Sequence, residues 1–206
     1  MRRTLFLAMT VTANCVGAWN SIMEMENDIC VALTNDNILL STPFTNQLHL
    51  ATGSPSEEMK SEAHMLLAIN AYQNFLITVD QSWLCRELSH ASNAVAAIGT
   101  HADKWQYWMA RFLHASAFIS TNDYVASYAI LTNALDGMAA YPHTNLASLV
   151  EGRIMDKFEM PGANMSMAFK VFAGMSAAEL GMGGVATNYA NQVPLPYRNT
   201  ILEFVR

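Results

Sequence analysis

Residues 102–138 read ADKWQYWMARFLHASAFISTNDYVASYAILTNALDGM, and this stretch decides the fold class. Large apolar side chains recur in it at spacings of three and four residues, which is the period of a helix with one buried face. Asn122 and Asp123 divide the stretch into two halves and are typical of a tight turn. The pattern therefore predicts two antiparallel helices. The side chains expected to be buried in this hairpin are Trp108, Phe112, Ala115 and Leu131.

The helical period continues on both sides of this hairpin. Further helices are expected at residues 19–34, 55–79, 81–98, 145–159, 164–180 and 197–206. Residues 35–53 are polar around Ile38, and residues 181–196 are rich in glycine and proline, so both segments are predicted to be loops. No alternating run is long enough to form a sheet. The chain is therefore predicted to be all-α, built from antiparallel helix pairs.

Several helix ends carry capping signals. Ser54 is expected to cap the helix that begins with Pro55, and Glu57 follows the cap by three residues, as in a capping box. Gly99 is expected to end the next helix, and Gly181 is expected to act as a left-handed terminator.

The hairpin at 102–138 resembles a tetratricopeptide repeat, in which small and large side chains alternate at fixed positions of two antiparallel helices. The residues that carry this resemblance are Ala115, Phe118, Tyr124, Ser127, Leu131 and Ala134. Two departures are Asn122, where the repeat usually has glycine, and the late position of Pro142. The resemblance implies a repeat-like stack whose concave surface holds a protein or peptide partner. The alternative is a single irregular helical bundle.

The first eighteen residues have the order of an export signal. Arg2 and Arg3 precede a short apolar stretch, and small residues stand at Val16-Gly17-Ala18. Residues 1–18 are therefore expected to be removed on export, leaving an N-terminal helix and polar loop at 19–53 and a helical domain at 54–206. The alternatives are a cut after Ala13, a lipid anchor on Cys15, or a first helix of the mature fold.

The overall charge disfavours several partners. The formal net charge is −6, and apart from Arg2-Arg3 the basic residues stand singly, so nucleic-acid binding is not expected. Hydrophobic residues make up 52% of the chain, which favours a well-filled core over disorder. No stretch approaches 18 uninterrupted apolar residues, and no membrane span is predicted.

The motifs for metal and cofactor chemistry are weak. Glu87 and His90 have the spacing used in di-iron bundles, but no second copy occurs. Met23/Met25 and Met165/Met167 resemble thioether copper sites, although methionine is also a common core residue. The glycine-rich stretch 181–184 follows a helix and is not succeeded by lysine, so it does not indicate phosphate binding. No metal, cofactor or catalytic residue is therefore assigned.

Two cysteines remain after the expected cleavage, Cys30 and Cys85, and an oxidising compartment would permit a disulfide between them. Two buried free thiols are the alternative. Trp105, Tyr107 and Trp108 could stack on a sugar, but their spacing favours Trp105 and Trp108 in the core and Tyr107 elsewhere on the helix.

The sequence favours an exported interaction module, periplasmic or secreted, that binds a protein or peptide partner. The alternative is a small-molecule-binding domain or an enzyme with its pocket between helices. A broad groove lined by aromatic or asparagine side chains favours the first, and a cleft lined by several titratable groups favours the second.

Overall fold

A computed structural model describes residues 19–138, 149–161 and 163–205. Over these residues the chain forms eleven helices and no strand, which confirms the all-α prediction. The helices are α1 (Ile22–Thr34), α2 (Asp36–Leu39), α3 (Thr42–Ala51), α4 (Glu57–Thr78), α5 (Ser82–Ile98), α6 (Trp105–Ser120), α7 (Tyr124–Met138), α8 (Leu149–Lys157), α9 (Met165–Glu179), α10 (Gly183–Ala190) and α11 (Leu195–Phe204). The expected export signal at 1–18, including Cys15, lies outside the described residues, as does Pro142.

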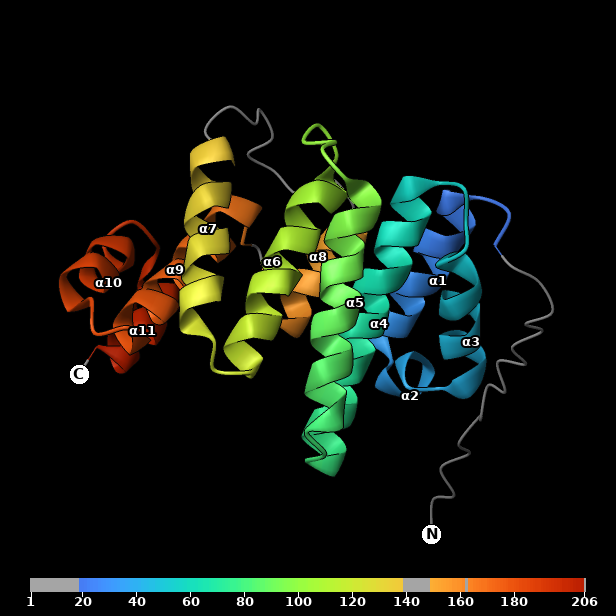
Figure 1. The fold of residues 1–206 in the computed structure, drawn as a ribbon, viewed down its shortest axis with the longest axis horizontal. Helices are drawn as coiled ribbons and strands as arrows, with labels where there is room; N and C mark the ends of the chain where they lie inside the picture. Colours follow the sequence, from blue (N-terminus) through green and yellow to red (C-terminus); the bar gives the residue numbers. More distant parts are fainter. Residues whose placement is uncertain (1–18, 139–148, 162, 206) are drawn as a thin grey trace, which may run out of the picture.

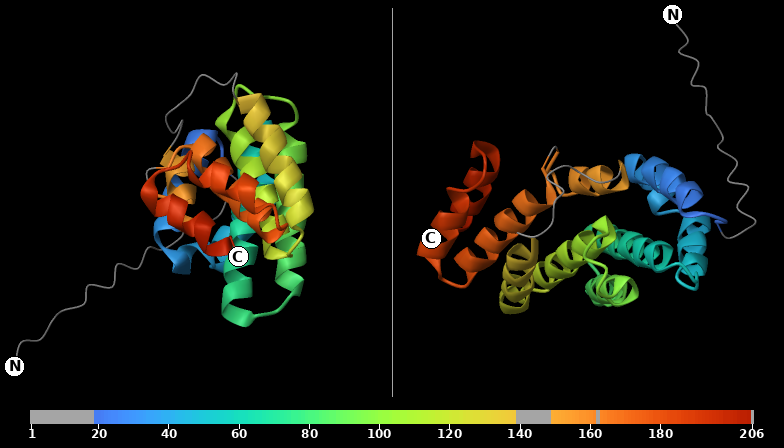
Figure 2. Two further views of the ribbon diagram at one scale, coloured as in Figure 1. Left: turned by 90° about the vertical axis from the view of Figure 1, so that its left-hand side faces the viewer. Right: turned by 90° about the horizontal axis from the view of Figure 1, so that it is seen from above.

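The helices form two layers. Figure 1 shows α4, α5, α6 and α7 standing side by side, and the view from above in Figure 2 shows α1, α8 and α9 in a second row behind them. Consecutive helices of the front row pack closely, first α4 with α5, then α5 with α6, then α6 with α7. Short connections make α4–α5 and α6–α7 antiparallel pairs, which agrees with the predicted helix pairs. The chain is therefore a helical array with a front and a back face.

One hydrophobic core joins the two layers. It extends from Trp19 to Ile201 and draws buried side chains from both ends of the described chain. The ring of Phe112 is fully buried and meets Phe158 and Phe172 edge-on, with ring centroids 5.1 and 4.8 Å away. The four side chains predicted to be buried in the hairpin, Trp108, Phe112, Ala115 and Leu131, are all buried.

Helix α4 lies at the centre of the fold, as its apolar character on most sides predicts. It packs against α1, α3, α5 and α6. Its cap is Ser56, whose hydroxyl accepts a hydrogen bond from the Met59 backbone N–H, so the predicted cap at Ser54 is two residues too early. The hydroxyl of Ser54 instead accepts a hydrogen bond from the Ser56 backbone N–H and supports the turn before the cap.

The two predicted loops, 35–53 and 181–196, were wrong. Residues 35–53 form α2 and α3, which bury Leu39, Phe44 and Leu48. Residues 183–190 form α10, and α11 begins at residue 195 with proline in its first turn. Proline in the first turn costs no helical hydrogen bond, because the N–H it lacks would have no helical acceptor. Proline here starts a helix.

The N-terminal helix is part of the core. Helix α1 packs against α8, which is more than a hundred residues further along the chain, and Lys157 of α8 forms an ion pair with Asp36 of α2. Met25 and Ile29 of α1 are fully buried. The segment 19–53 is therefore packed into the back layer of the fold through α1 and α8.

Candidate functional site

A groove opens on the front face between α5, α6 and α7. It has a volume of about 290 Å³ and is open to solvent. Because α6 lies between α5 and α7 in Figure 1, α6 forms the floor, and the other two helices form the walls. We call this site the α5–α6–α7 groove. The residues that line it are Val95 of α5, Tyr107, Trp108, Arg111 and His114 of α6, and Ile130, Asn133, Ala134 and Gly137 of α7.

The floor of the groove holds one arginine in a fixed position. The guanidinium of Arg111 lies over the ring of Tyr107, with its central carbon 3.4 Å from the ring centroid. Its Nη1 donates a hydrogen bond to the Tyr107 carbonyl at 3.1 Å. The Tyr107 ring in turn meets Trp108 edge-on at 4.8 Å, and Trp108 is anchored by a hydrogen bond from its Nε1 to the Ala102 carbonyl. This chain of contacts orients Arg111 before any ligand binds.

No described acidic residue neutralises the positive charge of Arg111. In the described part of the chain, no carboxylate forms an ion pair with it. Partial burial lowers the pKa of Arg111, although an arginine remains protonated at neutral pH. Burial, and then the charge of Arg111, lower the pKa of the neighbouring His114, so this imidazole is neutral at pH 7. The groove therefore carries one positive charge at neutral pH.

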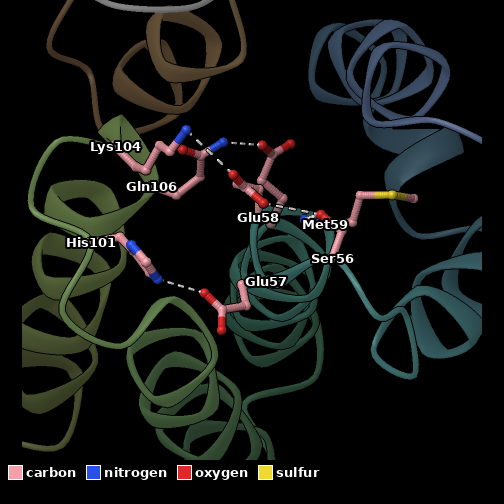
Figure 3. A network of polar contacts seen from close by, with 8 residues as sticks. Ser56, Glu57, Glu58, Met59, His101, Lys104 and Gln106 are labelled. Carbon is pink, nitrogen blue, oxygen red and sulfur yellow. Dashed lines mark hydrogen bonds and ion pairs between the residues drawn. The ribbon is translucent and has the colours of Figure 1, made fainter.

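A second polar cluster lies at the N-terminal end of α4, where the loop between α5 and α6 meets it (Figure 3). His101 Nε2 lies 2.8 Å from a Glu57 oxygen, and Lys104 Nζ lies 3.5 Å from a Glu58 oxygen. The Gln106 side chain reaches further in and donates a hydrogen bond to Glu62 at 2.7 Å. The exposed pairs contribute little to stability, because water screens them.

Glu62 is the most deeply buried carboxyl group of this cluster. It has no exposed surface, and burial raises its pKa to about 8, against the opposing effect of the Gln106 hydrogen bond. Its second oxygen, Oε2, and the Gln106 Oε1 have no hydrogen-bond partner among the described residues. A carboxyl group with this pKa is protonated at neutral pH, which avoids the cost of a buried charge.

Glu87 of α5 is a second buried carboxyl group. Ser120 donates a hydrogen bond to it at 3.3 Å, and burial raises its pKa to about 7. Its Oε2 has no partner in the described structure, but Glu87 borders a small cavity of about 20 Å³. A cavity of this size has room for a single water molecule, which would satisfy the free oxygen.

The structure separates Glu87 from His90, the pair that has a di-iron spacing in the sequence. Glu87 faces α6, whereas His90 meets His64 of α4 with the two Nδ1 atoms 3.2 Å apart. The centroids of the His64 and His90 rings lie 5.5 Å apart. This distance is longer than the separation of the two Nδ1 atoms by about the sum of the two ring radii. The nitrogens therefore face each other along the line between the rings, as in a hydrogen bond with one Nδ1 protonated.

The ring of His49, from α3, lies 6.0 Å from that of His90. This convergence of three histidines was not visible in the sequence, because they come from three helices. Burial, with the other histidines, lowers the pKa of His90 to about 4. No group of three or more histidine, cysteine or acidic side chains among the described residues has a geometry that could hold a metal ion.

The cysteines and methionines singled out in the sequence do not come together. Cys30 of α1 is half-buried, Cys85 of α5 is exposed, and both are free thiols in the structure. Figure 2 shows α4 standing between α1 and α5. The first methionine pair divides between two faces of α1, since Met25 is fully buried and Met23 is 68% exposed, whereas Met165 is buried and Met167 is partly buried against the same core. Residues two apart on a helix point in nearly opposite directions, which explains this division.

The aromatic residues of α6 lie as the helical period predicts. Trp105 and Trp108 are buried in the core, and Tyr107 is half-buried at the groove. In the glycine-rich stretch 181–184, Gly181 and Met182 connect α9 to α10, and Gly183 and Gly184 are the first residues of α10.

Comparison of the chain with protein-family models, curated proteins and solved structures finds no match. None of the helices in the described part of the chain combines the length and apolar character needed to cross a membrane. The α5–α6–α7 groove, by its geometry and charge, is therefore the feature of the molecule that indicates a function.

Proposed function

We propose that the protein is an exported interaction module that holds a segment of a partner protein in the α5–α6–α7 groove. The observation that carries this proposal is the oriented Arg111, which shares the floor of an open groove with the aromatic side chains of Tyr107 and Trp108. The antiparallel α6–α7 pair supplies most of the lining, in keeping with the resemblance to a tetratricopeptide repeat. Tyrosine, tryptophan and arginine are the residues that most often dominate binding energy at protein interfaces.

A small-molecule-binding domain is the second candidate. It is favoured by the groove volume of about 290 Å³, which is close to the lower end of the range for small-ligand pockets, and by three titratable groups in the lining. The two candidates share one site and differ in occupant. Measuring the affinity of the groove for peptides and for small molecules distinguishes the two candidates.

Filling the groove tests the proposal. Asn133 is an exposed lining residue of α7, and Asn133→Trp would place a large ring in the groove without disturbing the core. Peptides selected from a random displayed library on the wild-type protein are expected to bind this variant at least tenfold more weakly. Val125→Trp, at another exposed position of α7 outside the groove, is the matched control and is expected to bind normally. Isothermal titration of synthetic peptides gives both dissociation constants.

Two outcomes would contradict the proposal. If the library yields no binding peptide, or if the selected peptides bind Asn133→Trp as tightly as wild type, the groove is not a peptide site.

Export is the second part of the proposal. Arg2 and Arg3, the apolar stretch behind them and the small residues at 16–18 support cleavage after Ala18. Mass spectrometry of the protein from its native host is expected to find Trp19 at the N-terminus. Protein that retains Arg2 and Arg3 would refute cleavage.

A further inference from the structure

We infer that the α5–α6–α7 groove recognises an aspartate or glutamate side chain of the bound segment through the guanidinium of Arg111. The inference rests on the proposed function and names the chemistry of its ligand. It starts from charge: the chain has a net charge of −6, yet none of its described carboxylates pairs with Arg111. A half-buried cation without a partner in an acidic protein is complementary to an incoming anion.

The way in which Arg111 is held favours this ligand. Tyr107 covers one face of the guanidinium, and a single N–H is used for the Tyr107 carbonyl. An arginine has five N–H donors in one plane, so most of them stay free along the edge of the group. Stacking on an aromatic face leaves this edge available for two parallel hydrogen bonds to a carboxylate. Tyr107 thus positions Arg111, and Arg111 contacts the ligand.

The groove fits a carboxylate better than a phosphate group. A phosphate monoester carries close to two negative charges at neutral pH and is commonly bound by several cations. Among the described residues that line the groove there is one arginine and no lysine, and burial lowers the pKa of His114 and keeps it neutral. One positive charge matches the single negative charge of a carboxylate.

The shape of the groove favours a peptide as the source of the carboxylate. It is open to solvent and follows helix α6 from Tyr107 to His114, a distance of two turns. The same lining includes the apolar side chains of Val95 and Ile130 and the ring of Trp108. An acidic residue flanked by apolar residues would pair its carboxylate with Arg111 and bury its neighbours on these walls.

The test compares peptides selected on the wild-type protein with versions in which each aspartate or glutamate is replaced by asparagine or glutamine. We expect selected peptides to be enriched in acidic residues and the amide versions to bind 10- to 100-fold more weakly, the range for a hydrogen bond to a charged group. Arg111→Gln should lose affinity by a similar factor, and the acid and amide peptides should bind it alike. Arg111→Lys should recover part of the loss.

The outcomes separate this inference from the proposed function. Suppose that Asn133→Trp weakens peptide binding, but the acidic peptides and their amide versions bind the wild-type protein with equal affinity. The carboxylate inference then fails and the binding function stands. If Asn133→Trp leaves the affinity for the peptides unchanged, the proposed function itself fails. The exchange of acid for amide lies in the peptide, so the test holds even if Arg111→Gln does not fold.

Two small anions complete the experiment. Succinate and inorganic phosphate are titrated at equal ionic strength, with thermal unfolding as the readout. Weak or no stabilisation by either is expected. Binding of succinate as tight as that of the best peptide would overturn the peptide as occupant, and tighter binding of phosphate than of any carboxylate would overturn the choice of carboxylate.

Discussion

Ala115→Glu is expected to destabilise the protein by 3 kcal/mol or more, which is about 6–12 °C in the melting temperature for a chain of this size. Ala115 has no exposed surface and belongs to the main hydrophobic core. It lies on α6, which packs against α4, α5, α7 and α9, so no direction is open for a longer side chain to reach water. The substitution would bury a charge without a partner or force the helices apart.

The matched control is Ala129→Glu, at an exposed position of α7. It introduces the same side chain on a helix surface and is expected to change the melting temperature by no more than one or two degrees. Thermal unfolding followed by circular dichroism measures both. Equal melting temperatures for Ala115→Glu and wild type would mean that the packing face assigned to α6 is wrong.

Glu62→Gln is expected to stabilise the protein progressively as the pH rises. Burial raises the pKa of Glu62 from 4.5 to about 8 in the folded state. Between these two values the folded protein binds the proton more tightly than the unfolded chain, so the contribution of Glu62 to stability falls with rising pH. From pH 5 to pH 9 this loss is about 4 kcal/mol, since each pKa unit corresponds to about 1.4 kcal/mol.

Glutamine keeps the shape of the side chain and its acceptor for Gln106 but cannot ionise. The difference in unfolding free energy between the variant and wild type should therefore grow by about 4 kcal/mol between pH 5 and pH 9. Glu87, His64 and His90 also titrate, but they are present in both proteins and cancel in the difference. Urea denaturation at several pH values provides the free energies. A difference that does not change with pH would show that Glu62 is not buried as described.

The sequence predicted the long helices because their local signals agree with their packing. Gly99 ends α5, as predicted, with a φ of 59° and a ψ of −122°, and Gly181 follows α9 with the positive φ of 74° expected of a left-handed terminator. Asn164, a residue type favoured at this position, caps α9 by accepting a hydrogen bond from the Met167 backbone N–H. Each of these residues lies within a few residues of the helix end that it determines.

The short helices could not be predicted in this way. Helix α3 buries Phe44 and Leu48, but it has only ten residues, and threonine, asparagine, glutamine and histidine make up half of them, so the segment resembles a loop. Helix α10 begins with Gly183 and Gly184, which are poor helix formers, and packs against α9 and α11. In both helices tertiary packing outweighs local propensity.

The groove was predictable in part. The aromatic pattern of α6 separated the buried Trp105 and Trp108 from Tyr107, but nothing in the sequence indicates that Arg111 stacks on Tyr107 or lacks an acidic partner. A spacing of four residues places both on one face of the helix and is the one available signal. The contact between His64 and His90 depends on how α4 packs on α5. The burial of Glu87 depends in the same way on how α5 packs on α6. No local pattern encodes these contacts.

The most direct test of the central claim is to locate a bound peptide by NMR. The account predicts that a peptide selected on the protein shifts the backbone amide signals of residues 107–114 and 130–137 most strongly, because these segments carry the floor and one wall of the groove. The signals of α1 and α11 should remain in place, since neither helix lines it. Shifts concentrated on α1, α9 or α11, with the α6 and α7 signals unchanged, would contradict the α5–α6–α7 groove as the binding site.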